Sequence, residues 1–303
     1  MKLLDQVVQA ASAIDIEDGT GRYLLPGAGQ FSTTIDACQT RFIVDANVES
    51  YCRSLLRTER GMLIPRNEFL RLPTSAFWLE WPCEPSADAM SGSRSGVLVE
   101  ACDRGRSGRL TTFWEQKTGE PVVAQMIAGF DLDDEAMAAD APGGTWALRP
   151  GSHPLAANLT FAVAPGWQRH MDSLPPAAAR SAAGQIIANV LPGLEFAFAF
   201  SALLAERTCL NKRDVDLTRL NRQRRRKGKP PLLDHIEVRL ELSTGQSAQA
   251  WETSGDREPA RLHTVRGHMV NRLGRTFWRR SHLRGEPSRS GWTRTVHVTR
   301  KTG

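Results

Sequence analysis

The sequence lacks the short motifs that mark several common enzyme classes. It has no G-x-x-x-x-G-K-[ST] loop to hold nucleotide phosphates and no G-x-S-x-G turn to carry a serine nucleophile. Its five cysteines are odd in number, scattered and never spaced as C-x-x-C, which argues against a disulfide framework and a cysteine zinc site. The cysteine pattern predicts reduced thiols, as in a cytoplasmic protein.

The sequence also lacks an uninterrupted apolar run of membrane-spanning length. Residues 182–205 are strongly apolar but contain Gln185, Asn189, Glu195 and the pair Pro192-Gly193, whereas a spanning helix needs about 20 apolar residues in a row. The pair predicts two buried helices that meet there, and no membrane contact. At the N-terminus, apolar residues at 3, 4, 7, 8 and 11 predict an amphipathic helix and not a signal peptide.

Positive charge is abundant, and it is concentrated in the last third of the chain. Residues 211–303 hold 22 Lys and Arg against 9 Asp and Glu, a net charge of +13, whereas residues 1–210 hold 17 against 24, a net charge of −7. Arginine supplies 18 of the 22 cations, and its planar guanidinium suits phosphates and base edges. Such a potential concentrates polyanions. Nucleic acid is therefore the expected partner, and a solvated basic face without a partner is the plainer alternative.

The first half of the chain is expected to be rich in strands. Aromatic and branched residues predict a strand within 69–81, and glycine-containing turns separate three further candidates. Connections this short imply antiparallel pairing. The three further candidates are residues 95–101, 109–114 and 121–127. An acidic loop or short helix is expected at 131–144, and helices at about 155–207, where alanine is frequent.

The last third begins with an arginine-rich run. Residues 222–229 repel one another and are followed by Pro230-Pro231, so we expect an exposed arm or loop. Alternating apolar residues from 236 to 242 then predict a half-buried strand. Three more strands are expected at 261–270, 275–284 and 292–299, with a tight turn at Leu273-Gly274.

These segments predict an α+β fold with a β-rich N-terminal part, central helices and a mostly antiparallel four-stranded C-terminal sheet. The expected divisions are an acidic domain at 1–150, a helical segment at 151–210 that packs on either domain, and a basic domain at 211–303.

Three histidines lie on the strands expected around the Leu273-Gly274 turn. In a hairpin centred on this turn, His268 and His282 would approach each other. Two imidazoles beside arginine are what metal-independent RNA cleavage requires: one removes the 2′-hydroxyl proton, another protonates the leaving oxygen, and arginine stabilises the phosphorane. The candidate catalytic residues are His263, His268 and His282, with Arg266, Arg280 and Arg284 on phosphate.

Other readings of the same residues stay open. His263 and His268 are five residues apart and face opposite sides of a regular strand unless Gly267 forms a bulge. The histidines could serve the hairpin structurally or contact nucleic acid without catalysis. A metal site formed by these histidines and Asp234 has no recognisable spacing. Oxygen ligands cluster at Asp131, Asp133 and Asp134, where a divalent ion is a further possibility. We predict no metal and no cofactor.

Four stretches of the last third, 216–222, 228–238, 262–268 and 277–285, resemble an uncharacterised family of bacterial and phage or prophage proteins. The likeness covers about 70 residues, with a weaker echo at 72–81. That family has no assigned activity, so the resemblance transfers no functional residue. It implies a setting in mobile genetic elements, and with it nucleic-acid handling, host interference or defence.

The sequence thus predicts a phage-type nucleic-acid-binding protein that could be an endoribonuclease. The rival hypothesis is a noncatalytic interaction protein that docks on an acidic host or phage protein surface. The residues predicted to bind nucleic acid are Arg222, Arg224, Arg225, Arg226, Lys227, Lys229, Arg266, Arg280 and Arg284.

Overall fold

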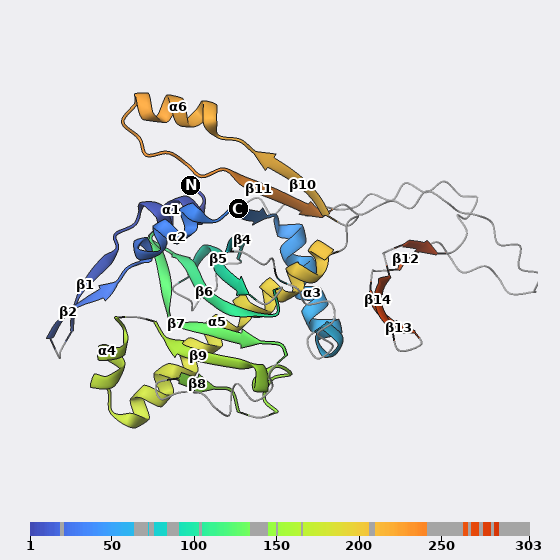
Figure 1. Cartoon of the computed structure of the whole chain (residues 1–303), viewed down its shortest axis with the longest axis horizontal. Helices are drawn as coiled ribbons and strands as arrows, with labels where there is room; N and C mark the ends of the chain where they lie inside the picture. The colour runs from blue at the N-terminus through green and yellow to red at the C-terminus, as the bar shows by residue number, and fades with distance from the viewer. Residues whose placement is uncertain are drawn as a thin grey trace, which may run out of the picture. The chain divides into compact units, whose positions relative to one another are not determined.

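The computed structural model describes most of the first 240 residues and four short strands after them (Figure 1). The described residues are 1–18, 21–63, 72, 76–83, 91–102, 105–133, 145–149, 151–164, 166–205, 210–240, 263–265, 268–272, 275–279 and 282–284. The chain forms two compact units, Met1–Glu241 and Leu242–Gly303. This boundary differs from those expected at 150 and 210, because the strands on either side of the arginine run belong to the sheet of the first unit.

A nine-stranded mixed sheet organises the first unit, in the order β10-β11-β3-β4-β5-β6-β7-β9-β8. The pairs β11–β3 and β3–β4 are parallel and the others are antiparallel. The predicted antiparallel succession β5, β6 and β7 is confirmed. The strands are β3 (Thr40–Val44), β4 (Phe77–Pro82), β5 (Ser91–Cys102), β6 (Ser107–Gln116), β7 (Pro121–Asp131), β8 (Thr145–Ala147), β9 (Leu159–Val163), β10 (Leu210–Val215) and β11 (His235–Leu240).

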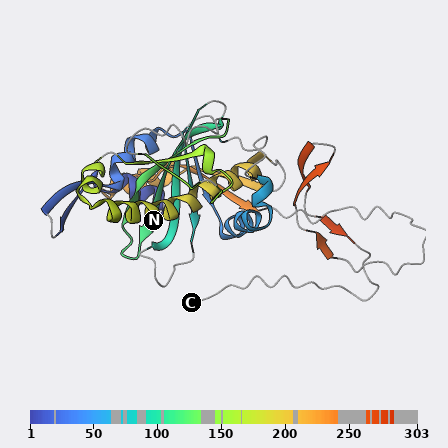
Figure 2. The same ribbon diagram turned by 90° about the horizontal axis from the view of Figure 1, so that it is seen from below.

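Helices cover both faces of this sheet (Figures 1 and 2). One face carries the predicted N-terminal helix α1 (Leu3–Gln9) with η1 (Ala28–Phe31) and α2 (Ser32–Ala37). The other face carries α5 (Pro176–Ala205), which packs on β5, β6 and β7, and α3 (Ala46–Leu63), which packs on α5. The remaining elements are the ribbon β1 (Ala13–Asp18) with β2 (Gly21–Pro26), η4 (Ala156–Asn158) and α4 (Gln168–Ser173).

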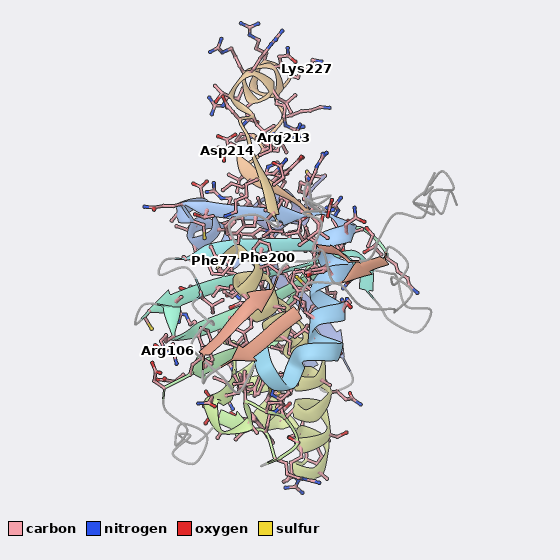
Figure 3. All side chains as sticks on the ribbon, turned by 90° about the vertical axis from the view of Figure 1, so that its right-hand side faces the viewer. Phe77, Arg106, Phe200, Arg213, Asp214 and Lys227 are labelled. Atoms are coloured by element: carbon pink, nitrogen blue, oxygen red, sulfur yellow. The ribbon has the colours of Figure 1, made fainter. Side chains whose placement is uncertain are left out.

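Strand β4 shows why the sheet needs both layers. Its residues from Phe77 to Trp81 are all buried, whereas a strand with one wet face would alternate. Trp78 packs with Phe113 on the α1 side. Phe77 and Phe200 both contact Phe42 on the α5 side, and Figure 3 shows the two labelled rings in the interior.

A buried carboxylate on β4 caps helix α1. Glu80 is fully buried, and its two oxygens accept hydrogen bonds from the backbone N–H groups of Leu3 (3.1 Å) and Leu4 (2.9 Å). Arg94 of β5 donates to the same carboxylate at 2.8 Å. Glu80 thus satisfies two of the free amides at the start of α1, which no side chain of the helix itself does.

The break expected at Pro192-Gly193 is wrong, because α5 is one helix of 30 residues. Pro192 lies on the exposed side, and Gly193 is buried against the sheet, where an added Cβ would lie 3.2 Å from Val97 Cγ1. Helix α5 is long and apolar enough to cross a membrane, but most of its apolar stretch is buried inside the protein. We interpret α5 as a helix of the hydrophobic core, packed on one face of the sheet. The range 155–207, expected to be helical, also contains strand β9.

The second unit contains two two-stranded sheets. Strand β12 (His263–Val265) pairs with β15 (His282–Arg284), and β13 (His268–Arg272) pairs with β14 (Arg275–Arg279). Strands β13 and β14 pair antiparallel on either side of Leu273-Gly274, and these two residues, where a turn is expected, lie outside the described residues. Among the described residues the expected four-stranded C-terminal sheet is not confirmed, because β11 pairs with β3 of the first unit. The strand expected at 292–299 lies outside the described residues.

Candidate nucleic-acid interface

Residues 222–226 of the arginine-rich run lie on a helix, α6 (Thr218–Arg226), so the expectation of an arm or loop without helix is wrong for them, whereas residues 227–229 lie outside the helix. Its expected exposure is confirmed, since no residue of α6 is buried. The helix stands between β10 and β11, and we call residues 210–240 the basic arm. Figure 1 shows α6 beyond the ends of these two strands. Hydrogen bonds with residues outside the helix hold it in place against the repulsion of its arginines.

Strands β10 and β11 form the root of the arm. They pair antiparallel from Leu210↔Leu240 to Val215↔His235, and β11 joins the arm to β3. Glu237 accepts from Arg213 at 2.6 Å and lies 3.5 Å from Arg239. Partial burial acts to raise the pKa of Glu237, but the hydrogen bond and charge of Arg213 outweigh it and lower the pKa. The carboxylate therefore keeps its charge and neutralises cations at the root.

Two aspartates begin helix α6. Asp216 accepts a hydrogen bond from the Thr218 N–H at 2.8 Å, and Asp234 accepts one from the Leu217 N–H at 2.7 Å. The hydrogen bonds from Thr218 lower the pKa of Asp216. Both carboxylates lie at the positive end of the helix, where negative charge is favourable.

The inner side of α6 is tied to the returning chain. The Asn221 side chain donates to the Leu232 carbonyl oxygen at 2.7 Å and accepts from the Leu232 N–H at 2.8 Å. Three residues on, Arg224 Nε donates to the Pro230 carbonyl oxygen at 2.8 Å. Asn221 and Arg224 are half-buried and the other seven residues of α6 are exposed. These contacts fix which face of the helix points outward.

The tip of the arm carries cations without any carboxylate. Between Leu217 and Leu233 the sequence has seven Lys and Arg and no Asp or Glu. None of these cations forms an ion pair within the part of the chain that the structure describes. Figure 3 shows side chains radiating from the region of α6, with Lys227 labelled at the end of the arm, while Arg213 and Asp214 lie nearer the sheet. The residues of the arm that are predicted to bind nucleic acid, Arg222, Arg224, Arg225, Arg226, Lys227 and Lys229, all lie in this tip.

A buried group near the N-terminus holds the base of the arm. Asp5 of α1 accepts a hydrogen bond from the Leu233 N–H at 2.9 Å, and it is 3% exposed. His235 is also buried, and its Nδ1 donates to the Leu233 carbonyl oxygen at 3.1 Å. Burial raises the pKa of Asp5, and the nearby Glu80 adds to this. Sequence spacing carried no signal for this contact between residues 228 positions apart.

A histidine–glutamate pair missed by the sequence reasoning lies at the other end of the sheet. His153 Nε2 and Glu195 Oε1 of α5 are 2.8 Å apart, and the Leu155 N–H donates to His153 Nδ1 at 3.1 Å. Nδ1 accepts, so Nε2 carries the hydrogen and donates to the carboxylate. Both nitrogens are therefore occupied, and the pair holds the 151–158 loop on α5 without a free nitrogen for general base catalysis.

The candidate catalytic histidines occupy two separate ribbons. His268 is opposite Arg279 in β13–β14, and His282 is opposite Val265 in β12–β15. The register is the same in both ladders, and residues 266, 267, 280 and 281 between them lie outside the described residues, so the expectation that His268 and His282 share one ladder stays a prediction. His263 is opposite Arg284, so positions 263, 282 and 284 lie on one face of β12–β15. Arg266 and Arg280 lie outside the described residues.

The aspartates considered as ligands for a divalent ion form contacts within the protein. Asp133 forms an ion pair with Arg106 at 2.6 Å, and this hydrogen bond lowers the pKa of Asp133. Asp131 accepts from the Asp133 N–H at 2.9 Å. Asp134 lies outside the described residues, and the described ones include no group of three potential metal ligands. Figure 3 shows Arg106 well away from α6.

Comparison with protein-family models, with curated proteins and with solved structures gave no match. The resemblance to phage and prophage proteins therefore stays a prediction.

Proposed function

We propose that this chain is a nucleic-acid-binding protein and that the tip of the basic arm is its contact surface. The observation that carries the proposal is the division of charge along the arm. Carboxylates occur at its root, where they cap α6 and pair with Arg213, and seven cations without a carboxylate occupy its tip. This arrangement fits a partner with a dense row of negative charge.

Phosphate binding explains why these cations stay unpaired. Each phosphate neutralised by Lys or Arg releases a condensed counterion, so affinity falls with salt by a slope of about −0.9 per phosphate contact on duplex DNA. Sequence-independent attraction of this kind requires exposed cations on a projecting surface. A cytoplasmic location, as the thiols predict, would give the arm access to both DNA and RNA.

Salt titration of binding tests the proposal. The native chain is titrated into labelled duplex DNA, single-stranded DNA and RNA between 20 and 300 mM salt. We expect a steep log–log slope on at least one of them. The triple variant Arg222→Gln/Arg225→Gln/Arg226→Gln should reduce that slope by about 2 to 3.

A matched control removes the same charge elsewhere. Arg149, Arg169 and Arg180 are exposed residues outside the arm, and their change to Gln lowers the net charge equally. This control should leave the slope nearly unchanged. An equal loss of salt slope in both triple variants would mean that the arm contributes only through the net charge of the protein and is not the contact surface. Absence of binding at low salt would overturn the proposal and favour the rival, a docking surface for an acidic protein.

We propose RNA cleavage as a second candidate activity, supported by the register of β12–β15. Positions 263 and 282 lie on one face of this ladder, and Arg284 is opposite His263. The candidate catalytic pair is therefore His263 with His282. One imidazole would accept the 2′-hydroxyl proton as its oxygen attacks phosphorus, and the other would protonate the departing 5′-oxygen. The products are a 2′,3′-cyclic phosphate and a free 5′-hydroxyl.

A gel assay with chelator present tests the cleavage. His263→Ala and His282→Ala should each lower the rate by a factor of about 100 or more, whereas His170→Ala, on α4 of the first unit, should not. Equal cleavage by all variants would show that the activity does not belong to this pair.

A further inference from the structure

The outward face of α6 has a composition that general phosphate binding does not require. Asn221 and Arg224 face the returning chain. At 100° per residue, the positions opposite them are 219, 222, 223 and 226, spaced i, i+3, i+4 and i+7. They are occupied by three arginines and Gln223, all exposed.

These residue types match the hydrogen-bonding edges of purines in a DNA major groove. Arginine binds O6 and N7 of guanine through two hydrogen bonds, and glutamine binds N6 and N7 of adenine in the same way. Arg225, Lys227 and Lys229 lie beside this face, where phosphate contacts would set the orientation. The outward face therefore combines base-reading residues with flanking phosphate ligands.

The shape of the arm fits the same groove. A helix of nine residues is about 13.5 Å long, and the major groove of B-form DNA, about 12 Å wide, admits an α-helix. The major groove of A-form RNA is too deep and narrow for side chains to read. No residue of α6 is buried, so its outward face is free to enter a groove.

The hydrogen bonds under α6 distinguish a reading helix from a flexible basic segment. A segment that only neutralised phosphates would need no fixed rotation about its axis. Asn221 bonds both backbone groups of Leu232, and Arg224 bonds Pro230, which fixes that rotation. Fixed orientation is what base contacts demand, since each bond depends on a defined donor position.

We infer that α6 binds in the major groove of B-form duplex DNA and reads purine edges through Arg219, Arg222, Gln223 and Arg226. This inference rests on the proposed nucleic-acid binding and narrows it to duplex DNA. RNA is an alternative outcome of the test below.

The experiment uses the full chain and a random-sequence 24-base-pair DNA pool. Selection should enrich duplexes that share a purine motif. The enriched duplex should bind at least about tenfold tighter than duplex RNA of the same sequence, and methylation of guanine N7 within the motif should block binding. Gln223→Ala, which leaves the charge unchanged, should weaken binding to the enriched duplex about tenfold.

Two controls accompany Gln223→Ala. Gln39→Ala changes an exposed glutamine of the body and should have no effect. Arg222→Lys keeps the charge and should keep the salt slope while losing discrimination at one base pair. Equal binding of duplex DNA and RNA, without N7 interference, would overturn the major-groove inference but keep nucleic-acid binding. Failure to bind any nucleic acid would overturn both.

Discussion

At the scale of single residues, Asn221 supports more of the arm than its size suggests. Its side chain is both donor and acceptor to Leu232, and so replaces a pair of backbone hydrogen bonds between α6 and the returning chain. The helix has no buried residue, so no apolar core can substitute for these contacts. The rotation of α6, and with it the outward face, depends on polar contacts.

Asn221→Ala should therefore weaken binding to duplex DNA and leave the body of the protein intact. Loss of two hydrogen bonds of about 1 kcal/mol each predicts at least about tenfold weaker binding. Fluorescence anisotropy measures the affinity, and urea unfolding should give nearly the native midpoint. Asn211→Ala, on the exposed strand β10, is the control. Equal affinity of the two variants would show that α6 needs no such anchor.

At the scale of elements, the sequence predicted strands better than the helix on which the proposed interface depends. Strands β5, β6 and β7 were predictable because glycine turns and apolar stretches determine them locally. Helix α6 had start and stop signals in Asp216 and Pro230-Pro231, yet its repelling arginines indicated a loop. Asn221 and Asp234 override that repulsion through contacts with distant parts of the arm, which no local pattern reveals.

The repulsion inside α6 has a measurable consequence. Arg222 and Arg226 are four residues apart, and Arg219 and Arg222 are three apart; such like-charge pairs each destabilise a helix by about 0.2 to 0.5 kcal/mol. Screening should relieve this, since the Debye length falls from about 30 Å at 0.01 M salt to 8 Å at 0.15 M. Amide hydrogen exchange in α6 should therefore slow as salt rises, while exchange in α5 stays constant.

The double variant Arg222→Gln/Arg226→Gln provides the matching test. It removes the i,i+4 pair, so its α6 amides should exchange more slowly than native at low salt and show little further change at high salt. The changes Arg169→Gln and Arg180→Gln remove the same charge outside the arm and should not alter exchange in α6. If amide exchange in α6 depended on salt as strongly in the double variant as in the native chain, repulsion between Arg222 and Arg226 would not be the cause.

At the scale of the whole molecule, the large sheet was beyond prediction because it joins distant segments. Strand β11 pairs in parallel with β3, and β3 with β4, so the last strand of the first unit lies next to its early part. Periodicity predicted β11 correctly as a strand but offered no partner, and the nearest candidates in sequence were the strands after 260. The division of charge along the sequence corresponds to a division in the first unit. Residues 1–205 build most of its core, and residues 210–240 form the basic arm.

Asp5 connects helix α1 to the base of the basic arm through its hydrogen bond with Leu233. Ionisation of its buried carboxyl group should oppose folding. Burial raises its pKa above the ordinary value of 3.8, as does the carboxylate of Glu80, whereas the Leu233 N–H, His235 and the terminal amine act in the opposite direction. With a folded-state pKa above the unfolded one, the stability that Asp5 contributes is complete below about pH 3.8. It is lost as the pH rises through the folded-state pKa.

Asp5→Asn keeps an oxygen to accept from the Leu233 N–H and removes the buried charge. The variant should therefore be more stable than native at pH 8, by about 1.4 kcal/mol per unit of pKa shift, with the difference shrinking towards pH 4. Urea unfolding between pH 4 and 8 measures it, and Asp36→Asn, at an exposed aspartate, is the control. A loss of stability at pH 8 would mean that the charge of Asp5, attracted by His235 and the terminal amine, holds the arm more strongly than burial opposes it.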